Sequence, residues 1–428
     1  MSFLKYVHRE NLEKMNSLAS KQWHSDYANI IFLRSLKEIE IKSQFPTKPL
    51  LFICNFLFFF FCLLLTPFFA FLFFVFFNIR AEKGGGFKGQ IKPEGDIYLC
   101  RTKATFDKYS NLLKKEDLIF FENHKYNSKC KQISIFHVSN LADLKAMLYC
   151  LITVFRDLWL LHKDFVVAIG SSIKSIRCMV RLYLRVIPRL IHKVCYEGCY
   201  RSLLDKVSFA NVKVYTGNKD DQFAAMEQRL SNKYTYELSC LPHGLEYGFM
   251  LPRSMPGKTV YCYTQNSARV LPKIYGNDGK YIYDEKLIKK VLGRDVGVNK
   301  SECYKVVQIF SSPRERELVR YVISELENSS INYTLKLHPL DSFSYYEDLC
   351  TSDVLTDSTF YGGLCISPPS TVLLQAIYSG GSAIGVYAHE QQLKDVEIQF
   401  PSLVDERINR FVKTSHKDFI SYYDEQFT

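Results

Sequence analysis

Two short motifs in the C-terminal part of this 428-residue chain place an imidazole and two hydroxyls where they could bind a phosphorylated ligand. The first, K-L-H-P, contains Lys336, His338 and Pro339, and the second, S-P-P-S-T, ends in Ser370 and Thr371. Imidazole can donate to a phosphate oxygen or contact a ribose and a base, and hydroxyls beside free helix N–H groups can hold an anion. Each motif also has a structural alternative, namely a histidine that only shapes a turn and hydroxyls that only cap a helix.

The elements around these motifs form one series of alternating strands and helices. Strands are expected over 304–310, 333–337, 363–366 and 383–386, and helices over 313–327 and 372–378. The strand segments are short, apolar and partly β-branched, and the first helix has a proline near its start. His338 then follows one strand directly, while Ser370 and Thr371 follow another and open a helix. Because ligands of such folds lie at the carboxyl ends of the strands, both motifs are expected at one cleft.

A second series precedes the first along the chain. Strands are expected over 97–101, 118–121, 133–138, 165–169, 212–215 and 234–241, and helices over 107–115 and 222–230. Alternation of this kind implies a mostly parallel sheet with helices on both faces. The polar stretch 275–300 is expected to be a linker. The predicted fold class is α/β, with two doubly wound Rossmann-type domains facing a cleft, the plan known as GT-B, and a hydrophobic membrane segment near the N-terminus.

The order of the motifs resembles a known group of enzymes. A strand, K-L-H-P, and then S-P-P-S-T opening a helix that continues into A-I-Y-S-G is similar to the C-terminal domain of bacterial sialyltransferases and polysialyltransferases. Capsule-type and CDP-glycerol-type transferases are similar as well. The resemblance covers residues 304–390 and, loosely, 210–250. It implies that His338 and Pro339 recognise a cytidine nucleotide and that Ser370 and Thr371 bind its phosphate.

The catalytic base is expected from the N-terminal series. In the sialyltransferase families an acidic tripeptide, D/E-D/E-G, follows a strand and deprotonates the acceptor hydroxyl, and this chain has no such tripeptide. The matching place is 241–247, where His243 precedes Gly244, and a His-Gly pair of the CDP-glycerol-type transferases is similar. A histidine near its reference pKa of ~6.5 can act as a base, and glycine allows a tight turn beside a ligand. His243 is the favoured base and Glu246 the alternative, while a histidine that only caps the strand is a third interpretation.

The sequence predicts no metal and no other cofactor. No D-x-D sequence occurs, and Asp220-Asp221 is followed by Gln222, so the metal-diphosphate clamp of the other large glycosyltransferase fold is missing. Helix N–H groups and hydroxyls would then stabilise the charge of the leaving phosphate. Lys336 and Arg314 are candidate additional cations at the nucleotide, with surface ion pairs as the alternative for both.

Residues 50–77 form an apolar run without any charge. As one helix rising ~1.5 Å per residue, the run would be roughly 42 Å long, more than the ~30 Å of hydrocarbon in a bilayer. Thr66-Pro67 lies just past its middle, and proline interrupts a helix. The run is therefore either one tilted, kinked span, or a hairpin or in-plane segment with both ends in the cytoplasm. Lysine and arginine flank both ends, which slightly favours the second alternative.

A second membrane signal lies in residues 171–195. Four arginines recur there at every fourth position, with apolar residues on much of the other side: Arg177, Arg181, Arg185 and Arg189. A basic stripe opposite an apolar one is typical of a helix at a membrane surface, where arginines bind lipid phosphates. The alternative is a solvated helix on a domain surface. Pro188 is expected to kink or end this helix.

Composition limits the partners. The net charge is +11 and the pI is about 8.9, which suits an anionic membrane surface or an anionic substrate. No Lys/Arg tract or nucleic-acid motif occurs, so nucleic acid is not an expected partner. The 13 cysteines are scattered and are expected to be reduced, packed thiols. We expect the bulk of the chain, after Arg80, on the cytoplasmic side of a bacterial inner membrane.

These observations predict an organisation and a function. The expected parts are an N-terminal helical segment (1–48), a membrane-inserted segment (49–79), an acceptor domain (80–274), a linker (275–300), a nucleotide-binding domain (301–400) and a C-terminal helix packing back on the fold (401–428). The resemblance implies a membrane-associated, inverting glycosyltransferase that uses a CMP-activated sugar of the sialic acid or Kdo type. Its product would be a surface polysaccharide or lipid-linked oligosaccharide, and its partners the donor, a glycan or glycolipid acceptor and inner-membrane lipid. The alternatives are a CDP-polyol phosphotransferase and a non-catalytic scaffold on a transferase fold.

Overall fold

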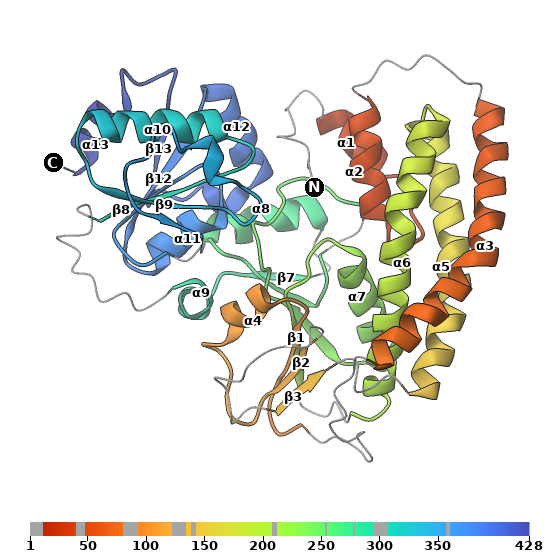
Figure 1. Cartoon of the computed structure of the whole chain (residues 1–428). Helices are drawn as coiled ribbons and strands as arrows, with labels where there is room; N and C mark the ends of the chain where they lie inside the picture. Colours follow the sequence, from red (N-terminus) through yellow and green to blue (C-terminus); the bar gives the residue numbers. More distant parts are fainter. Residues whose placement is uncertain are drawn as a thin grey trace.

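The computed structural model contains two parallel β-sheets flanked by helices, with a bundle of long helices beside the N-terminal sheet (Figure 1). The described residues are 12–39, 48–79, 93–121, 134–137, 143–207, 212–252, 255–276, 279–293, 306–356 and 360–427. In Figure 1 the C-terminal sheet and its helices lie at the upper left, the N-terminal sheet lies below, and the long helices stand at the right.

The N-terminal sheet has seven strands in the order β3-β2-β1-β4-β5-β6-β7, and all neighbouring pairs are parallel. The strands are β1 (Ile97–Cys100), β2 (Leu118–Phe121), β3 (Ser134–His137), β4 (Lys213–Thr216), β5 (Glu237–Cys240), β6 (Thr259–Tyr261) and β7 (Lys280–Ile282). The shorter helices of this part are α4 (Lys103–Tyr109), α7 (Gln222–Tyr234), α8 (Gln265–Tyr275) and α9 (Glu285–Leu292). All four residues of β1 are buried, as expected for a central parallel strand covered on both faces.

The C-terminal sheet has six parallel strands in the order β10-β9-β8-β11-β12-β13. The strands are β8 (Val307–Phe310), β9 (Tyr333–Lys336), β10 (Val354–Leu355), β11 (Leu364–Ser367), β12 (Ser382–Tyr387) and β13 (Ile408–Val412). Its helices are α10 (Arg316–Asn328), α11 (Thr371–Tyr378), α12 (Glu390–Gln399) and α13 (Phe419–Phe427), with the 3-10 helices η4 (Phe343–Tyr345) and η5 (Pro401–Leu403). In both sheets the strand order reverses beside the first strand, which is the Rossmann arrangement. The predicted α/β class with two doubly wound sheets is confirmed.

Several boundaries of the expected parts differ from the structure. The range 275–300, expected to be a linker, contains β7, which extends the N-terminal sheet, and α9. The range 401–428, expected to be a helix packing back on the fold, contributes β13 to the C-terminal sheet before α13 packs against α10. Strand β7 has only three residues and β13 carries Asn409 and Arg410, so neither has the continuous apolar run that predicts a buried strand.

Three long helices, α3 (Lys48–Ile79), α5 (Leu144–Ser171) and α6 (Ile176–Leu204), lie side by side (Figure 1). The shorter α1 (Leu12–Ala19) and α2 (Ala28–Ile39) complete the bundle, with α2 packed against α5 and α6 and with α1 packed against α2. The strand predicted over 165–169 is wrong, because these residues belong to α5. A short apolar run cannot distinguish a buried strand from a buried helix segment, and here the packing of α5 on α3 and α6 decides. Helix α6 also continues through Pro188 to its end at Leu204, with the buried Val186 and Leu190 on either side.

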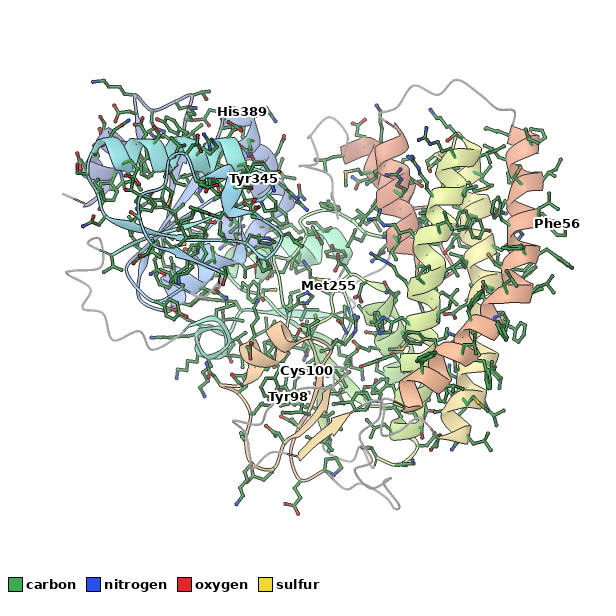
Figure 2. The ribbon with its side chains drawn as sticks, viewed as in Figure 1. Phe56, Tyr98, Cys100, Met255, Tyr345 and His389 are labelled. Atoms are coloured by element: carbon green, nitrogen blue, oxygen red, sulfur yellow. The ribbon has the colours of Figure 1, made fainter. Side chains whose placement is uncertain are left out.

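One narrow face of α3 packs against α5 and α6. Its buried residues recur every three or four positions and include most of the small and polar residues of the run: Leu51, Asn55, Phe59, Cys62, Thr66, Ala70 and Phe74. The Asn55 amide lies 3.2 Å from Nδ1 of His162 on α5 and accepts a hydrogen bond from the Tyr183 hydroxyl on α6 (2.7 Å). In an apolar surrounding such bonds fix how helices pair. Phe56 lies on the outer side of α3 (Figure 2).

Helix α3 is continuous from Lys48 to Ile79 and contains Pro67. The alternative of a hairpin that turns at Thr66-Pro67 is therefore wrong, and the run is one helix that bends along its length (Figure 1). The buried Thr66 and Ala70 hold the segment around the proline against the other helices, so packing compensates for the backbone bond that proline removes. Among the described residues, this is the one helix that is long and apolar enough to cross a membrane.

The two sheets meet along a seam that contains the carboxyl ends of several strands. One buried apolar cluster includes Leu241, directly after β5, and Phe310, the last residue of β8. Across the seam, the N–H of Gly248 donates to the carbonyl oxygen of Gln399 at 2.9 Å. The Tyr378 hydroxyl donates to the carbonyl oxygen of Tyr263 at 2.5 Å. Loops that follow the strands of one sheet thus contact the other domain.

Candidate functional site

The loop after β5 brings His243 to the carboxyl edge of the N-terminal sheet. The backbone N–H groups of Leu241 and His243 donate to the carbonyl oxygens of Thr216 and Gly217, at the end of β4. The ring Nδ1 of His243 lies 2.6 Å from the Gly217 carbonyl oxygen. Because a carbonyl oxygen can only accept, Nδ1 carries the proton, and Nε2 of the neutral ring is an acceptor. This is the tautomer that a general base requires.

His243 and Lys108 both have lowered pKa values. The His243 side chain is exposed, yet the surrounding protein removes part of its hydration and lowers its pKa below 6.5, with the charges of Lys219 and Lys108 acting in the same direction. Lys108 donates from Nζ to the His243 carbonyl oxygen (2.5 Å) and to the Tyr263 hydroxyl (3.2 Å). Burial and the charge of Lys219 lower the pKa of Lys108 to about 7. At neutral pH the imidazole of His243 is therefore uncharged and able to accept a proton.

Glu246 belongs to the same loop but is fully buried. Its Oε1 accepts a hydrogen bond from the backbone N–H of Tyr263 at 2.8 Å. Burial raises the pKa of this carboxyl group. A carboxyl group that is closed off from solvent cannot reach the hydroxyl of an acceptor, so the geometry favours His243 over Glu246 as the base.

Two further cationic side chains near this loop were not among the site residues predicted from the sequence. Lys219 follows β4 and lies with Nζ 4.1 Å from the ring centroid of Tyr247. Arg101 directly follows β1, pairs with Asp221 at 2.9 Å and covers the ring of Phe223 at 3.3 Å. Both residues lie at or shortly after the ends of predicted strands, and this position could have identified them as candidate site residues. Lys108 offered no signal of this kind, because it lies within α4 and only the tertiary fold brings it to the loop.

His338 lies at the carboxyl edge of the C-terminal sheet, two residues after the end of β9 at Lys336. It is exposed, and its backbone N–H donates to Oγ of Ser311 at 2.9 Å. Its Nδ1 accepts a hydrogen bond from the N–H of Leu340 at 3.1 Å. Because a backbone N–H can only donate, the proton of the neutral ring is on Nε2. His338 is therefore set to donate from Nε2, whereas His243 is set to accept.

Ser370 and Thr371 lie at the start of α11, which follows β11 as expected. Ser370 is the N-cap residue, and its Oγ accepts from the N–H of Val372 at 3.4 Å. The capping interpretation of Ser370 is thus correct, and it leaves the O–H free to donate to a ligand. Both side chains are half-buried, and the N-terminal N–H groups of α11 provide the partial positive charge that an anion requires.

The remaining nucleotide residues of the prediction occupy different environments. Lys336 is buried, and its Nζ lies 4.1 Å from the ring centroid of Tyr361, whereas Pro339 is exposed beside the histidine. Arg314, from the loop after β8, is near both domains. Partial burial lowers the pKa of His338, and the positive charge of Arg314 lowers it further. Burial raises the pKa of Tyr247, and the charge of Arg314 offsets part of this rise. The charge of Arg314 thus acts on groups in both the loop after β5 and the loop after β9.

A recess of ≈ 680 Å³ opens on the seam between α8 and α12. It is lined by Gly248, Asn266, Val270, Gln391, Lys394, Glu397, Ile398 and Pro401. None of the site residues predicted from the sequence lines it. Gly248 nevertheless belongs to the same loop as His243, so the recess adjoins the loop that carries the candidate base.

The arginine stripe lies on α6 as predicted. Arg177, Arg181 and Arg185 are exposed. Arg189 is half-buried, and it is close enough to Asp221, at the end of the loop after β4, for that charge to act on its pKa. The stripe therefore runs along the helix bundle toward the edge of the N-terminal sheet.

Replacing the four arginines of the stripe by glutamine is expected to weaken binding to vesicles of anionic lipid and to remove most of its salt dependence, because charge attraction is screened by salt. Cosedimentation with vesicles over a range of salt concentrations measures this. Replacing four exposed lysines, Lys280 on β7 and Lys286, Lys289 and Lys290 on α9, by glutamine removes the same number of charges and is a control for net charge. Equal losses in both variants would show that the stripe has no special role.

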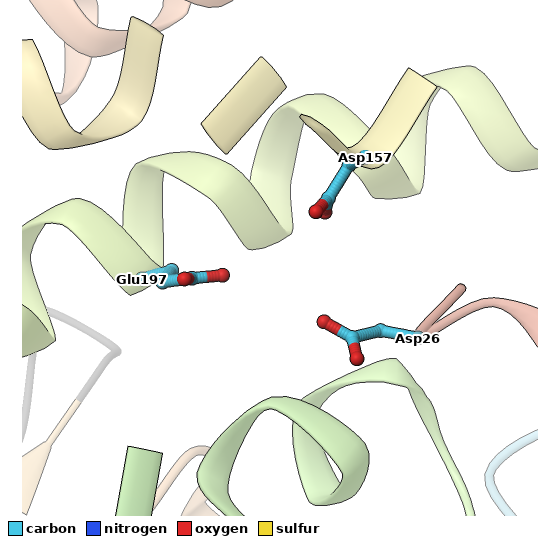
Figure 3. Close-up of side chains that lie close together, drawn as sticks. All are labelled: Asp26, Asp157 and Glu197. Carbon is cyan, nitrogen blue, oxygen red and sulfur yellow. The ribbon is translucent and has the colours of Figure 1, made fainter. Parts of the chain in front are cut away.

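A group of carboxylates at the centre of the bundle has the spacing of a metal site. Asp26, Asp157 and Glu197 point toward one another from three different segments (Figure 3). The ammonium of Lys193 lies 2.8 Å from Asp26, 2.8 Å from Asp157 and 2.5 Å from Glu197. Arg229 adds contacts to Asp26 at 2.8 Å and to Glu197 at 3.0 Å. The position that a metal ion would take is occupied by a lysine, so we interpret this group as a buried ion-pair network.

Comparison with protein-family models finds no match, and comparison with curated proteins finds no significant match either. The fold itself defines the class of this protein, a two-domain α/β protein with Rossmann-type sheets and one long apolar helix.

Proposed function

We propose that the chain is a membrane-associated, inverting glycosyltransferase of GT-B plan that uses a CMP-activated sugar of the sialic acid or Kdo type. The product would be a bacterial surface polysaccharide or a lipid-linked oligosaccharide, made on the cytoplasmic side of the inner membrane. The observation that carries the proposal is the pair of histidines with opposite tautomers. His243 presents an acceptor nitrogen after a strand of one sheet, and His338 presents a donor nitrogen after a strand of the other.

The proposed reaction is a direct displacement. Nε2 of His243 takes the proton of an acceptor hydroxyl, whose oxygen forms a bond to the anomeric carbon of the donor sugar. The bond from this carbon to the phosphate oxygen breaks, and CMP leaves with the electron pair, so the configuration at the carbon inverts. The N–H groups at the start of α11, the hydroxyls of Ser370 and Thr371, and Nε2–H of His338 would stabilise the phosphate charge.

A CDP-polyol phosphotransferase is the second candidate. In that reaction the acceptor hydroxyl attacks phosphorus. The transferred group is a negatively charged phosphate, which would lie near the catalytic base, His243. Lys108, whose Nζ lies 2.5 Å from the carbonyl oxygen of His243, is suited to such a charge in its protonated form. The distinction is chemical: the first candidate releases CMP from a sugar nucleotide, and the second releases CMP from a CDP-polyol and transfers a phosphate with the polyol.

A panel of CMP, CDP, UDP and GDP added to the detergent-purified protein tests the nucleotide. We expect CMP or CDP to raise the melting temperature, because a ligand that binds the folded state adds RT ln(1 + [L]/Kd) to its stability. His338→Ala is expected to abolish this shift. His389→Ala is a matched control, since His389 is also exposed, follows a strand of the same sheet and accepts a backbone N–H at Nδ1 (Figure 2). A shift with UDP or GDP alone would exclude the cytidine site.

A further inference from the structure

Helix α5 carries an exposed apolar stripe that the sequence analysis did not predict. Its large apolar side chains recur at helical spacing and are 38% to 69% exposed: Leu144, Leu148, Ile152, Phe155, Trp159 and Val166. Single exposed apolar residues are common on soluble proteins, but a stripe along most of a 28-residue helix marks a contact surface.

The stripe on α5 is continuous with the apolar surface of α3. The rings of Phe59 on α3 and Trp159 on α5 have centroids 6.0 Å apart, and His162 packs against the same phenylalanine at 4.5 Å. Apart from the narrow face that packs on the bundle, the large apolar side chains of α3 are mostly exposed between Leu50 and Phe76. The two helices together form one apolar face on the side of the bundle away from both sheets (Figure 1).

The other helices of the bundle expose mostly polar side chains. Helix α6 exposes Arg177, Arg181 and Arg185 together with Leu184, and α1 exposes Glu13 and Lys14. The segment between α1 and α2 is fixed to the middle of α5, where the Tyr27 hydroxyl donates to Asp157 at 3.1 Å and Ser25 N–H donates to Asp164 at 2.8 Å. If α3 crossed the bilayer, α5 would cross beside it, and these polar segments would lie at the level of the hydrocarbon, which is costly.

We propose that α3 and α5 form one lipid-binding face that lies along the plane of the membrane, immersed in the acyl chains of a single leaflet. The partner is the bilayer itself, since α3 supplies the apolar length of a membrane helix and α5 continues its surface. The face places α6, α1, α2 and both sheets on the aqueous side, with the basic stripe of α6 near the headgroups. This inference builds on the membrane association proposed above and adds α5 and the orientation.

The two tryptophans of the chain test this proposal directly. Trp159 belongs to the α5 stripe, and Trp23 lies between α1 and α2, where its Nε1 donates to the Leu18 carbonyl oxygen at 3.1 Å. The full chain is reconstituted into vesicles whose lipids carry bromine either near the headgroup or near the end of the acyl chain. Trp23→Phe reports Trp159 alone, and Trp159→Phe reports Trp23 alone. Should Trp23→Phe fail to fold, the difference between the unaltered chain and Trp159→Phe gives the signal of Trp159.

We expect bromine to quench Trp159 and to leave Trp23 unchanged, with more quenching from the shallow position than from the deep one. Stronger quenching from the deep position would overturn the in-plane orientation, because Trp159 lies near the middle of α5. No quenching of Trp159 in chains that still float with the vesicles would overturn the role of α5 while leaving membrane association intact; crosslinking of two chains through α5 would then identify a second copy as the occupant.

An independent variant supports the same test. Ile152→Lys is expected to lower the fraction of chain retained on vesicles, since it places a charge in the apolar stripe. Leu355→Lys makes the same change at an exposed apolar position on β10, outside the proposed face, and should not alter retention. Equal retention of the two variants would contradict the proposal.

Discussion

Replacing His243 by alanine is expected to lower the rate of sugar transfer by ~10²–10⁴-fold, which is the usual contribution of a general base. The affinity for the nucleotide should be unchanged, because His338, Ser370 and Thr371 lie on the other sheet. Steady-state kinetics with a CMP-activated donor gives the rate, and the thermal shift with CMP gives the affinity. If His243→Ala transfers sugar at the normal rate, the residue is not the base and the scaffold alternative becomes stronger.

Glu246→Gln is the matched control for the base. Glutamine keeps an oxygen that can accept the N–H of Tyr263, so we expect a much smaller loss of rate than for His243→Ala. The pH profile gives a second readout. His243 acts when neutral, and burial lowers its pKa below the ordinary value of 6.5, so the pH at which the rate falls to half its maximum should lie below 6.5. A larger loss in Glu246→Gln would reassign the base to Glu246.

Replacing Lys193 by methionine is expected to destabilise the folded chain by about 3–5 kcal/mol, the usual effect of removing one partner from a buried ion pair. The ammonium contacts Asp26, Asp157 and Glu197, and without it their oxygens face one another in a buried site. These groups join the segment before α2 to α5 and α6, so the bundle should loosen. Thermal unfolding of the detergent-purified protein measures the change.

Lys145→Met is the control, because it makes the same substitution in an exposed ion pair with Asp205 and should cost less than about 1 kcal/mol. Equal effects of the two variants would contradict the role assigned to Lys193.

The stability that this network contributes also depends on pH. Burial alone would raise the pKa of Asp26, but Lys193 and Arg229 outweigh it and hold the value at about 2. The stability that Asp26 contributes is present above its ordinary pKa of 3.8 and is lost as the pH falls through about 2.

Local pattern was sufficient for most strands and for the site motifs. Nine of the ten expected strands overlap observed ones, because short β-branched runs bounded by polar turns favour strands. The placement of His243, His338 and Ser370 directly after strands followed from that pattern alone. The strand at 165–169 failed, since an isolated apolar run is compatible with either a buried strand or a buried helix.

The chain's own residues determined the α/β class, the apolar run of α3 and the motif residues at strand ends, because these depend on neighbours in sequence. Only the tertiary structure decided how distant side chains act together. It chose the tautomers of His243 and His338 through Gly217 and Leu340, and it brought Lys108 to the loop after β5. It also enclosed Glu246, surrounded Lys193 with three carboxylates and left the stripe of α5 exposed. Burial and hydrogen-bond partners arise from packing between segments far apart in the chain, and no local pattern of residues encodes them.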